Sequence, residues 1–211
     1  MQEKYELSIL MAAETGSHSF HLQSDRSDKD IRFIYKYNRL HSYLSINPPK
    51  ELISYTDHLH EIEGWDLFKT ARLFQKSNPA LYEWFFSKQL FPENEFTAAL
   101  KGVINDHYSL RTLGRHYFNM AARNIALLQK KDMNDPKSHK TLVQAGRCFL
   151  MCLFILQHRK LPPLSVRDLL AHVEIKGPIS ELLDMNFHYK RNHRIPDQTS
   201  LGGLLRLLQN I

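Results

Sequence analysis

Residues 16–37 read GSHSFHLQSDRSDKDIRFIYKY, a polar segment that leads into an apolar one. Its last seven residues, 31–37, are rich in β-branched and aromatic side chains, which predicts a strand. Residues 5–12, before it, are continuously apolar after Glu6 and are followed by a turn at Gly16, which predicts a second, buried strand. Two strands around a polar segment therefore open the fold.

The pattern changes further along the chain. Residues 53–62 alternate, which predicts a third extended segment with Asp57, Leu59 and Glu61 on one face. From Trp65 onward the apolar residues recur with a helical period. After a first helix there, we expect helices at residues 79–87, 93–107, 109–130, 139–158, 165–171, 177–188 and 200–209. Strands first and helices after predict an α+β protein, with a small mixed β-sheet near the N-terminus and a helical C-terminal region.

Two acidic residues lead into the strand at residues 31–37. In an extended strand Asp28 and Asp30 project from the same face, where they can grip one divalent cation. Gly16 and Ser17 precede them, and a Gly-Ser turn that opens a short helix offers backbone N–H groups and a hydroxyl to a phosphate. Each signal alone is common, but the two in this order predict a site for metal and phosphate.

The arrangement resembles the core of the DNA polymerase β nucleotidyltransferase superfamily, with its Gly-Ser helix start, Asp-x-Asp strand and third carboxylate on a later strand. A more specific resemblance covers most of the chain. The strings GSHSFHLQSDRSDKDIRFIY, EIEGWDLFK and KSNPALYEWFFS look like the predicted bacterial and phage nucleotidyltransferase family called RlaP or YcgL-like. This resemblance implies a nucleotidyltransferase core over residues 1–90 and a helical region over residues 91–211 that completes the cleft.

The resemblance also implies roles for individual residues. Asp28, Asp30 and Glu61 would be the catalytic carboxylates and would bind Mg²⁺ or Mn²⁺, although the family usually has Asp at the position of Glu61. Gly16 and Ser17 would contact a nucleoside triphosphate (NTP).

Further basic residues are candidates for binding the substrate. His18 stands where the resemblance leads us to expect Arg, and His18, Lys69 and Lys140 are candidate nucleotide contacts. A cluster near the end of a predicted helix, Lys190, Arg191 and Arg194, is a candidate for binding phosphates or an RNA backbone, the alternative being a solvated helix C-terminus.

The implied reaction is Mg²⁺-dependent transfer of a nucleoside monophosphate from an NTP to a hydroxyl, with release of pyrophosphate. An RNA end is the first acceptor to consider, because the family name reflects a proposed link to RNA repair. A protein hydroxyl, as in AMP transfer by some toxin–antitoxin pairs of the superfamily, and a small-molecule hydroxyl stay open. Outside this class, His18 and Glu61 motivate a degenerate member that binds nucleotide or RNA without transfer. A plain interaction module is the third interpretation.

The charge of the chain is uneven. Residues 1–105 carry 12 Lys and Arg against 14 Asp and Glu, whereas residues 106–211 carry 16 against 8. This asymmetry suggests a polyanionic partner, such as an NTP or RNA, against the alternative of a basic surface kept for solubility.

Location is inferred from what the sequence contains. No apolar run approaches the roughly 20 residues that span a bilayer. The first residues include acidic side chains where a secretory signal would be basic. We therefore expect a cytoplasmic protein that does not associate with a membrane. Cys148 and Cys152 lie in an apolar run and are expected to be buried thiols.

Overall fold

The computed structural model describes residues 2–25, 27–129, 135–175, 178–192 and 203. Contacts divide the chain into two units, with residues 1–19 and 28–108 in unit 1 and residues 20–27 and 109–211 in unit 2. The segment after the Gly-Ser turn therefore groups with the helical unit, although both of its neighbours in sequence group with the sheet. The division expected at residue 90, and the cleft that the helical region would complete, stay predictions.

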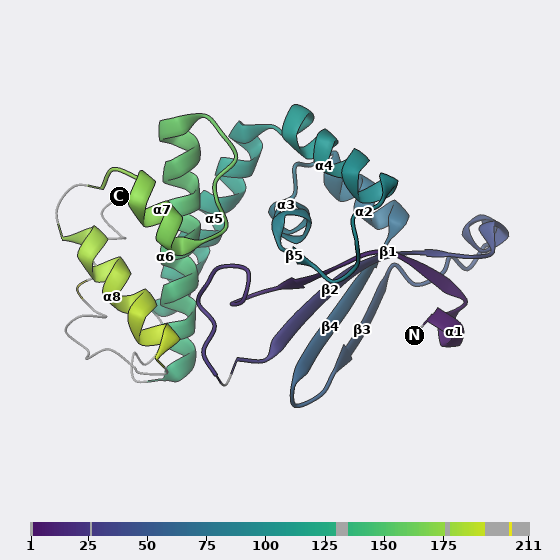
Figure 1. Ribbon diagram of the computed structural model, residues 1–211, viewed down its shortest axis with the longest axis horizontal. Helices are drawn as coiled ribbons and strands as arrows, with labels where there is room; N and C mark the ends of the chain where they lie inside the picture. Colours follow the sequence, from purple (N-terminus) through teal and green to yellow (C-terminus); the bar gives the residue numbers. More distant parts are fainter. Residues whose placement is uncertain (1, 26, 130–134, 176–177, 193–202, 204–211) are drawn as a thin grey trace. The chain divides into compact units, whose positions relative to one another are not determined.

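Unit 1 is built on a five-stranded mixed sheet with the strand order β3-β4-β2-β1-β5 (Figure 1). Strands β2 and β4 are parallel, whereas the pairs β1 and β2, β1 and β5, and β3 and β4 are antiparallel. The elements, in chain order, are α1 (Gln2–Tyr5), β1 (Leu7–Thr15), β2 (Lys29–Tyr37), the 3-10 helix η1 (Leu40–Leu44), β3 (Leu52–Thr56), β4 (His60–Asp66), α2 (Leu67–Phe74), α3 (Pro79–Phe86), β5 (Lys88–Gln89) and α4 (Glu95–His107). The α+β class with a small mixed sheet is confirmed, and so are the strands predicted on either side of the Gly-Ser segment.

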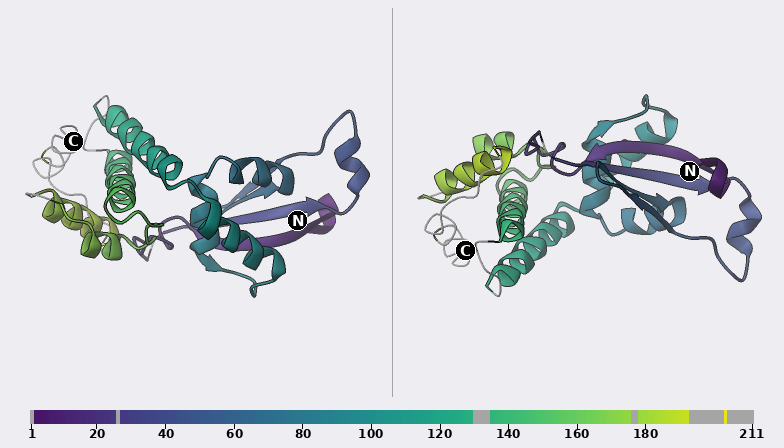
Figure 2. Two further views of the ribbon diagram at one scale, coloured as in Figure 1. Left: turned by 90° about the horizontal axis from the view of Figure 1, so that it is seen from above. Right: turned by 90° about the horizontal axis from the view of Figure 1, so that it is seen from below.

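The two faces of the sheet bury different side chains. In both figures α2, α3 and α4 lie on one side of the sheet (Figures 1 and 2). The ring of Trp65 on β4 lies 4.1 Å from that of Trp84 on α3, measured between centroids. Phe33 and Tyr35 belong to a second buried cluster. Gly64 is required there, because a Cβ at this position would lie 2.2 Å from the Phe33 ring.

The single extended segment predicted over residues 53–62 is wrong. The chain forms two antiparallel strands, β3 and β4, and turns between them. The Asp57 carboxylate accepts hydrogen bonds from the backbone N–H groups of Leu59 and His60, each at 2.8 Å. Both hydrogen bonds lower the pKa of the Asp57 carboxyl, and the bond from Leu59 has the larger effect. Asp57 and Leu59 therefore belong to the turn and do not share a strand face with Glu61.

Unit 2 is helical. Its helices are α5 (Leu110–Leu128), α6 (Pro136–His158), α7 (Val166–His172) and α8 (Ile179–Arg191). They confirm the four helices predicted between residues 109 and 188, whereas the helix predicted at residues 200–209 falls almost wholly outside the described residues. Cys148 and Cys152 are free and buried, as predicted.

Helix α6 is apolar as well as long. Within the described part of the chain it is the one helix that could cross a membrane by length and composition, and 56% of the apolar stretch is buried inside the molecule. The core helix of a soluble protein can have the same length and composition, so this property is weak evidence of a membrane span.

Specific contacts of Phe20 explain why the segment after the Gly-Ser turn groups with unit 2. The guanidinium of Arg147 on α6 lies 3.8 Å from the centroid of the Phe20 ring. The backbone N–H of Val166 donates to the carbonyl of Phe20 at 3.2 Å. Phe20 and Leu22 are both buried, whereas His21, Gln23 and Asp25 between and after them are exposed, so only these two apolar side chains are buried in the helical unit.

Candidate metal and nucleotide site

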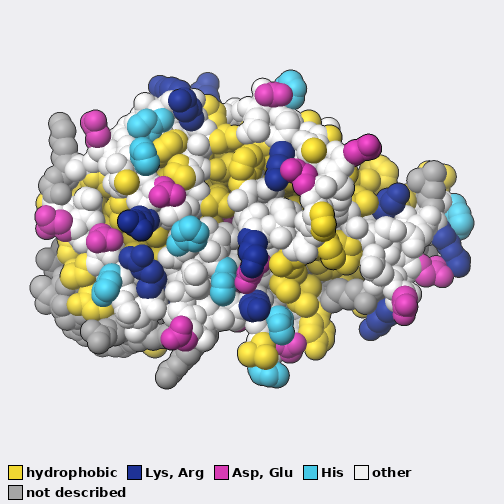
Figure 3. Space-filling model, viewed as in Figure 1, with side chains coloured by type: hydrophobic (Ala, Val, Ile, Leu, Met, Phe, Trp, Pro, Cys, Tyr) yellow, Lys and Arg dark blue, Asp and Glu magenta, His cyan; other side chains and the backbone are white. Residues whose placement is uncertain are grey.

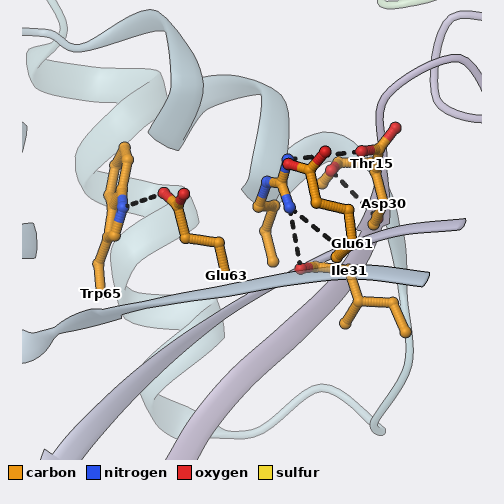
Figure 4. A network of polar contacts seen from close by, with 7 residues as sticks. Thr15, Asp30, Ile31, Glu61, Glu63 and Trp65 are labelled. Atoms are coloured by element: carbon orange, nitrogen blue, oxygen red, sulfur yellow. Dashed lines mark hydrogen bonds and ion pairs between the residues drawn. The ribbon is translucent and has the colours of Figure 1, made fainter. Parts of the chain in front are cut away.

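Asp30 and Glu61 lie directly opposite each other on the parallel strands β2 and β4. The Arg32 guanidinium joins them, because its Nη2 lies 3.4 Å from Asp30 Oδ1 and 2.6 Å from Glu61 Oε1 (Figure 4). Its Nη1 also donates to the Glu61 carbonyl at 3.1 Å. The Asp30 side chain is 19% exposed and that of Glu61 46%, so the pair is open to solvent on the Glu61 side. Two carboxylates from neighbouring strands thus converge on one cationic group.

The Gly16 turn presses against the Asp30 carboxylate. Gly16 has φ of 65°, in the left-handed region, and a Cβ here would lie 1.8 Å from Asp30 Oδ2. Thr15, the last residue of β1, donates from Oγ1 to the Asp30 carbonyl at 3.2 Å. Only glycine allows the backbone to approach the carboxylate this closely.

The short helix predicted after the Gly-Ser pair is wrong. Residues 16–21 form turns, and none of the described residues 16–25 is helical. His21 also has a positive φ, 54°. Two left-handed residues in this short span interrupt a helical path, so the backbone N–H groups expected from a helix start would have to come from the turn itself.

His18 is held by an acidic residue of β1. Its Nδ1 lies 3.4 Å from Glu14 Oε1, and Lys88 Nζ lies 3.6 Å from Glu14 Oε2. His18 Nε2 is buried, with no hydrogen-bond partner among the described residues. Ser17, beside it, is half-buried.

Asp28 is exposed and lies just before β2. The described residues contain no group of three His, Cys, Asp or Glu side chains that could hold one metal ion. Asp28 therefore does not complete a three-carboxylate set with Asp30 and Glu61 in this conformation. The structure brings together Gly16, Asp30 and Glu61 from the predicted site.

Arg32 lies at this site although the sequence patterns above did not single it out. It follows Asp30 by two positions in a strand, so the strand period alone places both on one face. Glu63, opposite Arg32 on β4, was missed as well. Its carboxylate accepts from Trp65 Nε1 at 2.7 Å, and Lys69 Nζ lies 5.1 Å from the centroid of a Trp65 ring. A polar row thus extends along β4 from Glu61 towards the candidate nucleotide contact Lys69.

Asp66 closes this strand and begins α2. Its carboxylate accepts from the Phe68 N–H at 2.8 Å and from the Tyr43 hydroxyl at 2.6 Å. Burial, followed by the hydrogen bond with Asp66, raises the pKa of Tyr43 to about 12. Asp66 is 2% exposed, and its role as the N-cap of α2 accounts for its contacts.

The remaining candidates belong to the helical unit. Lys140 is exposed on α6, Lys190 and Arg191 lie in the last turn of α8, and Arg194 lies outside the described residues. Charged side chains of both signs, together with histidines, are interspersed on the face shown in Figure 3. An anion would therefore bind this face only where several basic side chains lie close together.

The comparison with protein families decides the relationship. The family described as "RlaP: RNA repair pathway DNA polymerase beta family" matches residues 1–206. The chain belongs to the RlaP family. This RlaP chain is 34% identical over 191 residues to the uncharacterized protein YcgL of Bacillus subtilis (strain 168), and the match covers 87% of this chain and 72% of YcgL.

A solved structure gives a weaker match. It is a nucleotidyltransferase-like protein from Exiguobacterium sibiricum 255-15, with 14% identity and a TM-score of 0.39, over 100% of this chain and 72% of that one. The family resemblance expected from the three sequence motifs is confirmed by the family match and by YcgL. The RlaP chain is thus a member of a family that is described as a DNA polymerase beta family of an RNA repair pathway.

Proposed function

We propose that this RlaP protein is a divalent-cation-dependent nucleotidyltransferase that moves a nucleoside monophosphate from an NTP to a hydroxyl. The observation that carries the proposal is the pairing of Asp30 with Glu61 on parallel strands, with the Gly16 turn against the Asp30 carboxylate. Two carboxylates on adjacent strands can bind a metal ion, and the backbone of the turn beside them can bind a phosphate close to that ion.

The donor set fits Mg²⁺ or Mn²⁺ in kind. Both cations prefer carboxylate oxygens, and Asp30 and Glu61 already point at a shared cation, the Arg32 guanidinium. In the proposed site these two residues, with Asp28 as a third carboxylate, hold the metal. Metal ions bound there would neutralise charge on the phosphates and lower the pKa of the acceptor hydroxyl.

The residues of the chain have separate roles in the proposed reaction. The Gly16 and Ser17 turn binds the phosphates, and His18 and Lys69 are the further nucleotide contacts. The acceptor oxygen forms a bond to the α-phosphorus, the bond from that phosphorus to the bridging oxygen breaks, and pyrophosphate leaves. The hydroxyl proton passes to a carboxylate of the site or to solvent. Orientation by the two strands supplies the alignment that such a step requires.

An RNA end is the proposed acceptor. The family description names an RNA repair pathway, which supports an RNA hydroxyl ahead of a protein or small-molecule hydroxyl. We place the reaction in the cytoplasm, as the sequence predicts.

The test is transfer of label from each α-³²P-NTP, with Mg²⁺ or Mn²⁺, to total cell RNA and to lysate protein. Asp30→Asn and Glu61→Gln should each lower the rate by at least about 100-fold, since a correctly held metal contributes several kcal/mol to the transition state. Asp57→Asn is the matched control, because it removes an exposed carboxylate from the turn next to β4. Equal transfer by wild type and Asp30→Asn would overturn the proposal.

A second function, nucleotide binding without transfer, is favoured by one observation. The positive charge of Arg32 already offsets one of the two negative charges of Asp30 and Glu61, and Asp28 does not complete the set in this conformation. This alternative predicts stabilisation by NTP without label transfer. At 100 times Kd, binding contributes about 2.7 kcal/mol, which corresponds to a rise in Tm of about 5 °C or more for a chain of this size. Stabilisation that Asp30→Asn abolishes, in the absence of transfer, would replace the first proposal with this one.

A further inference from the structure

One face of α5 gathers cationic and hydrogen-bonding side chains. Arg111, Arg115 and Asn119 succeed each other at intervals of four residues, and Thr112 and His116 lie beside them on the helix. Residues four apart are neighbours on a helix surface. The five side chains line a cavity of about 450 Å³.

This face lacks acidic neighbours in the sequence. No Asp or Glu occurs between His107 and Lys131. Arg111 and Arg115 are exposed, and neither forms an ion pair with a residue that the structure describes. Guanidinium groups stay charged at any physiological pH and match phosphate in a two-pronged geometry. The cavity therefore suits an anion with several phosphate oxygens.

The length of the face indicates a strand of phosphates. Arg123 continues the four-residue spacing beyond Asn119 and is also exposed. At 1.5 Å per residue the distance from Arg111 to Arg123 is about 18 Å. A single nucleotide carries its phosphates within a few bonds of one another, so it would occupy only part of this length.

An exposed aromatic ring accompanies the arginines. Phe118 lies three residues after Arg115, one turn along α5, and is 56% exposed. Aromatic side chains next to a basic groove bind unpaired bases by stacking, whereas bases inside a duplex are already stacked.

We propose that this α5 basic face, defined as Arg111, Arg115, Phe118, Asn119 and Arg123, binds single-stranded RNA. The arginines contact successive phosphates, Asn119 offers a hydrogen bond to a sugar or base, and Phe118 stacks on a base. Binding by this face does not depend on nucleotide transfer. Only the identification of the bound strand as the acceptor rests on the proposed function.

The test is fluorescence anisotropy of the full chain with a 5′-labelled 12-nucleotide RNA of mixed sequence, over a range of KCl concentrations. Arg111→Gln with Arg115→Gln should weaken binding at least about 10-fold. The slope of log K against log[salt] should fall by about 1.4, because each phosphate that an arginine neutralises accounts for about 0.7 of it. Phe118→Leu should weaken binding at least about 5-fold with little change in that slope, because the substitution removes stacking and leaves the charge unchanged.

The matched control is Lys160→Gln with Arg167→Gln, which removes two exposed charges elsewhere in the helical unit. An equal loss of affinity in this control and in the α5 double variant would overturn the assignment, as would wild-type binding by the α5 variant. Equal affinity for DNA of the same sequence would overturn the preference for RNA. Full competition by stoichiometric inorganic triphosphate would show a single-nucleotide site instead.

The Asp30→Asn variant distinguishes a role of the α5 basic face in RNA binding from the proposed nucleotide transfer. Asp30→Asn should leave RNA affinity unchanged while it abolishes label transfer. Intact RNA binding without any transfer would contradict the enzyme alone. Transfer that Asp30→Asn abolishes, combined with no effect of the α5 substitutions on RNA affinity, would contradict the α5 basic face alone.

Discussion

Substitution of Gly16 by Ala should damage the candidate site and the stability of unit 1 together. The left-handed backbone at this position costs a residue with a Cβ about 1–2 kcal/mol. The new Cβ would lie 1.8 Å from Asp30 Oδ2, and contacts below 3.0 Å essentially do not occur, so the carboxylate has to move by about 1.2 Å or more. That movement also disturbs its contact with Arg32. Overall we expect the free energy of unfolding to fall by about 2–3 kcal/mol, with a fall in Tm of about 4–12 °C.

The effect on function should exceed the effect on stability. A displacement of about 1 Å in a reacting geometry can lower a rate by about 100-fold. The assays are thermal unfolding and the label-transfer rate, both measured below the Tm of the variant. Gly102→Ala is the control, because its Cβ meets nothing within 4 Å and α4 gains from alanine.

A double-mutant cycle isolates the clash from the backbone strain. In the Asp30→Ala background the carboxylate is gone, so Gly16→Ala should cost less stability than it does in the wild type. An equal cost in both backgrounds would refute the claim that the turn is fitted to the Asp30 carboxylate. So would a Gly16→Ala variant that unfolds and transfers label as the wild type does.

Three further predictions concern single residues. Arg32→Met should lower the free energy of unfolding by about 1–2 kcal/mol in metal-free buffer and increase the stabilisation by Mg²⁺, because the two carboxylates lose their shared cation; equal Mg²⁺-induced shifts in Tm for variant and wild type would contradict this. Gly64→Ala should cost about 1–3 kcal/mol in urea unfolding, because the new Cβ would lie 2.2 Å from the Phe33 ring; an unchanged midpoint would contradict the packing argument. Burial lowers the pKa of His139 in the folded protein. As the pH falls below about 6.5, the imidazole is therefore protonated in the unfolded chain before it is protonated in the folded one. The free energy of unfolding consequently decreases as the pH falls through this range. The drop in Tm between pH 7.5 and 5.5 should therefore be smaller for His139→Leu, and an equal drop would refute this cause.

Local patterns predicted most elements of the fold. The apolar run before Gly16, the β-branched and aromatic strand after Asp30, and the helical periods in unit 2 each depend on residues close in sequence. The parallel pairing of β2 with β4 depends on contacts across the sheet, which a pattern in one segment does not contain. Phe20 shows the same limit, because its ring and its carbonyl contact Arg147 and Val166, far away along the chain.

The errors have local physical causes. Asp57 ends β3 by accepting two backbone hydrogen bonds, and alternation of polar and apolar residues continues across this turn without marking it. Positive φ at Gly16 and His21 replaces the expected short helix by turns. Arg32 could have been found, since it follows Asp30 by two positions in a predicted strand. Its interpretation as a shared partner required the register of Asp30 with Glu61, which only the structure supplies.

Electron paramagnetic resonance of Mn²⁺ tests most directly whether Asp30 and Glu61 form one divalent-cation site. The signal of free Mn²⁺ falls as the ion binds, so the affinity of the protein can be measured without nucleotide. We predict that Asp30→Asn and Glu61→Gln each weaken the tightest Mn²⁺ binding by at least about 10-fold, equivalent to about 1.4 kcal/mol, and that Asp57→Asn leaves it unchanged. The same affinity in the wild type, Asp30→Asn and Glu61→Gln would contradict the account.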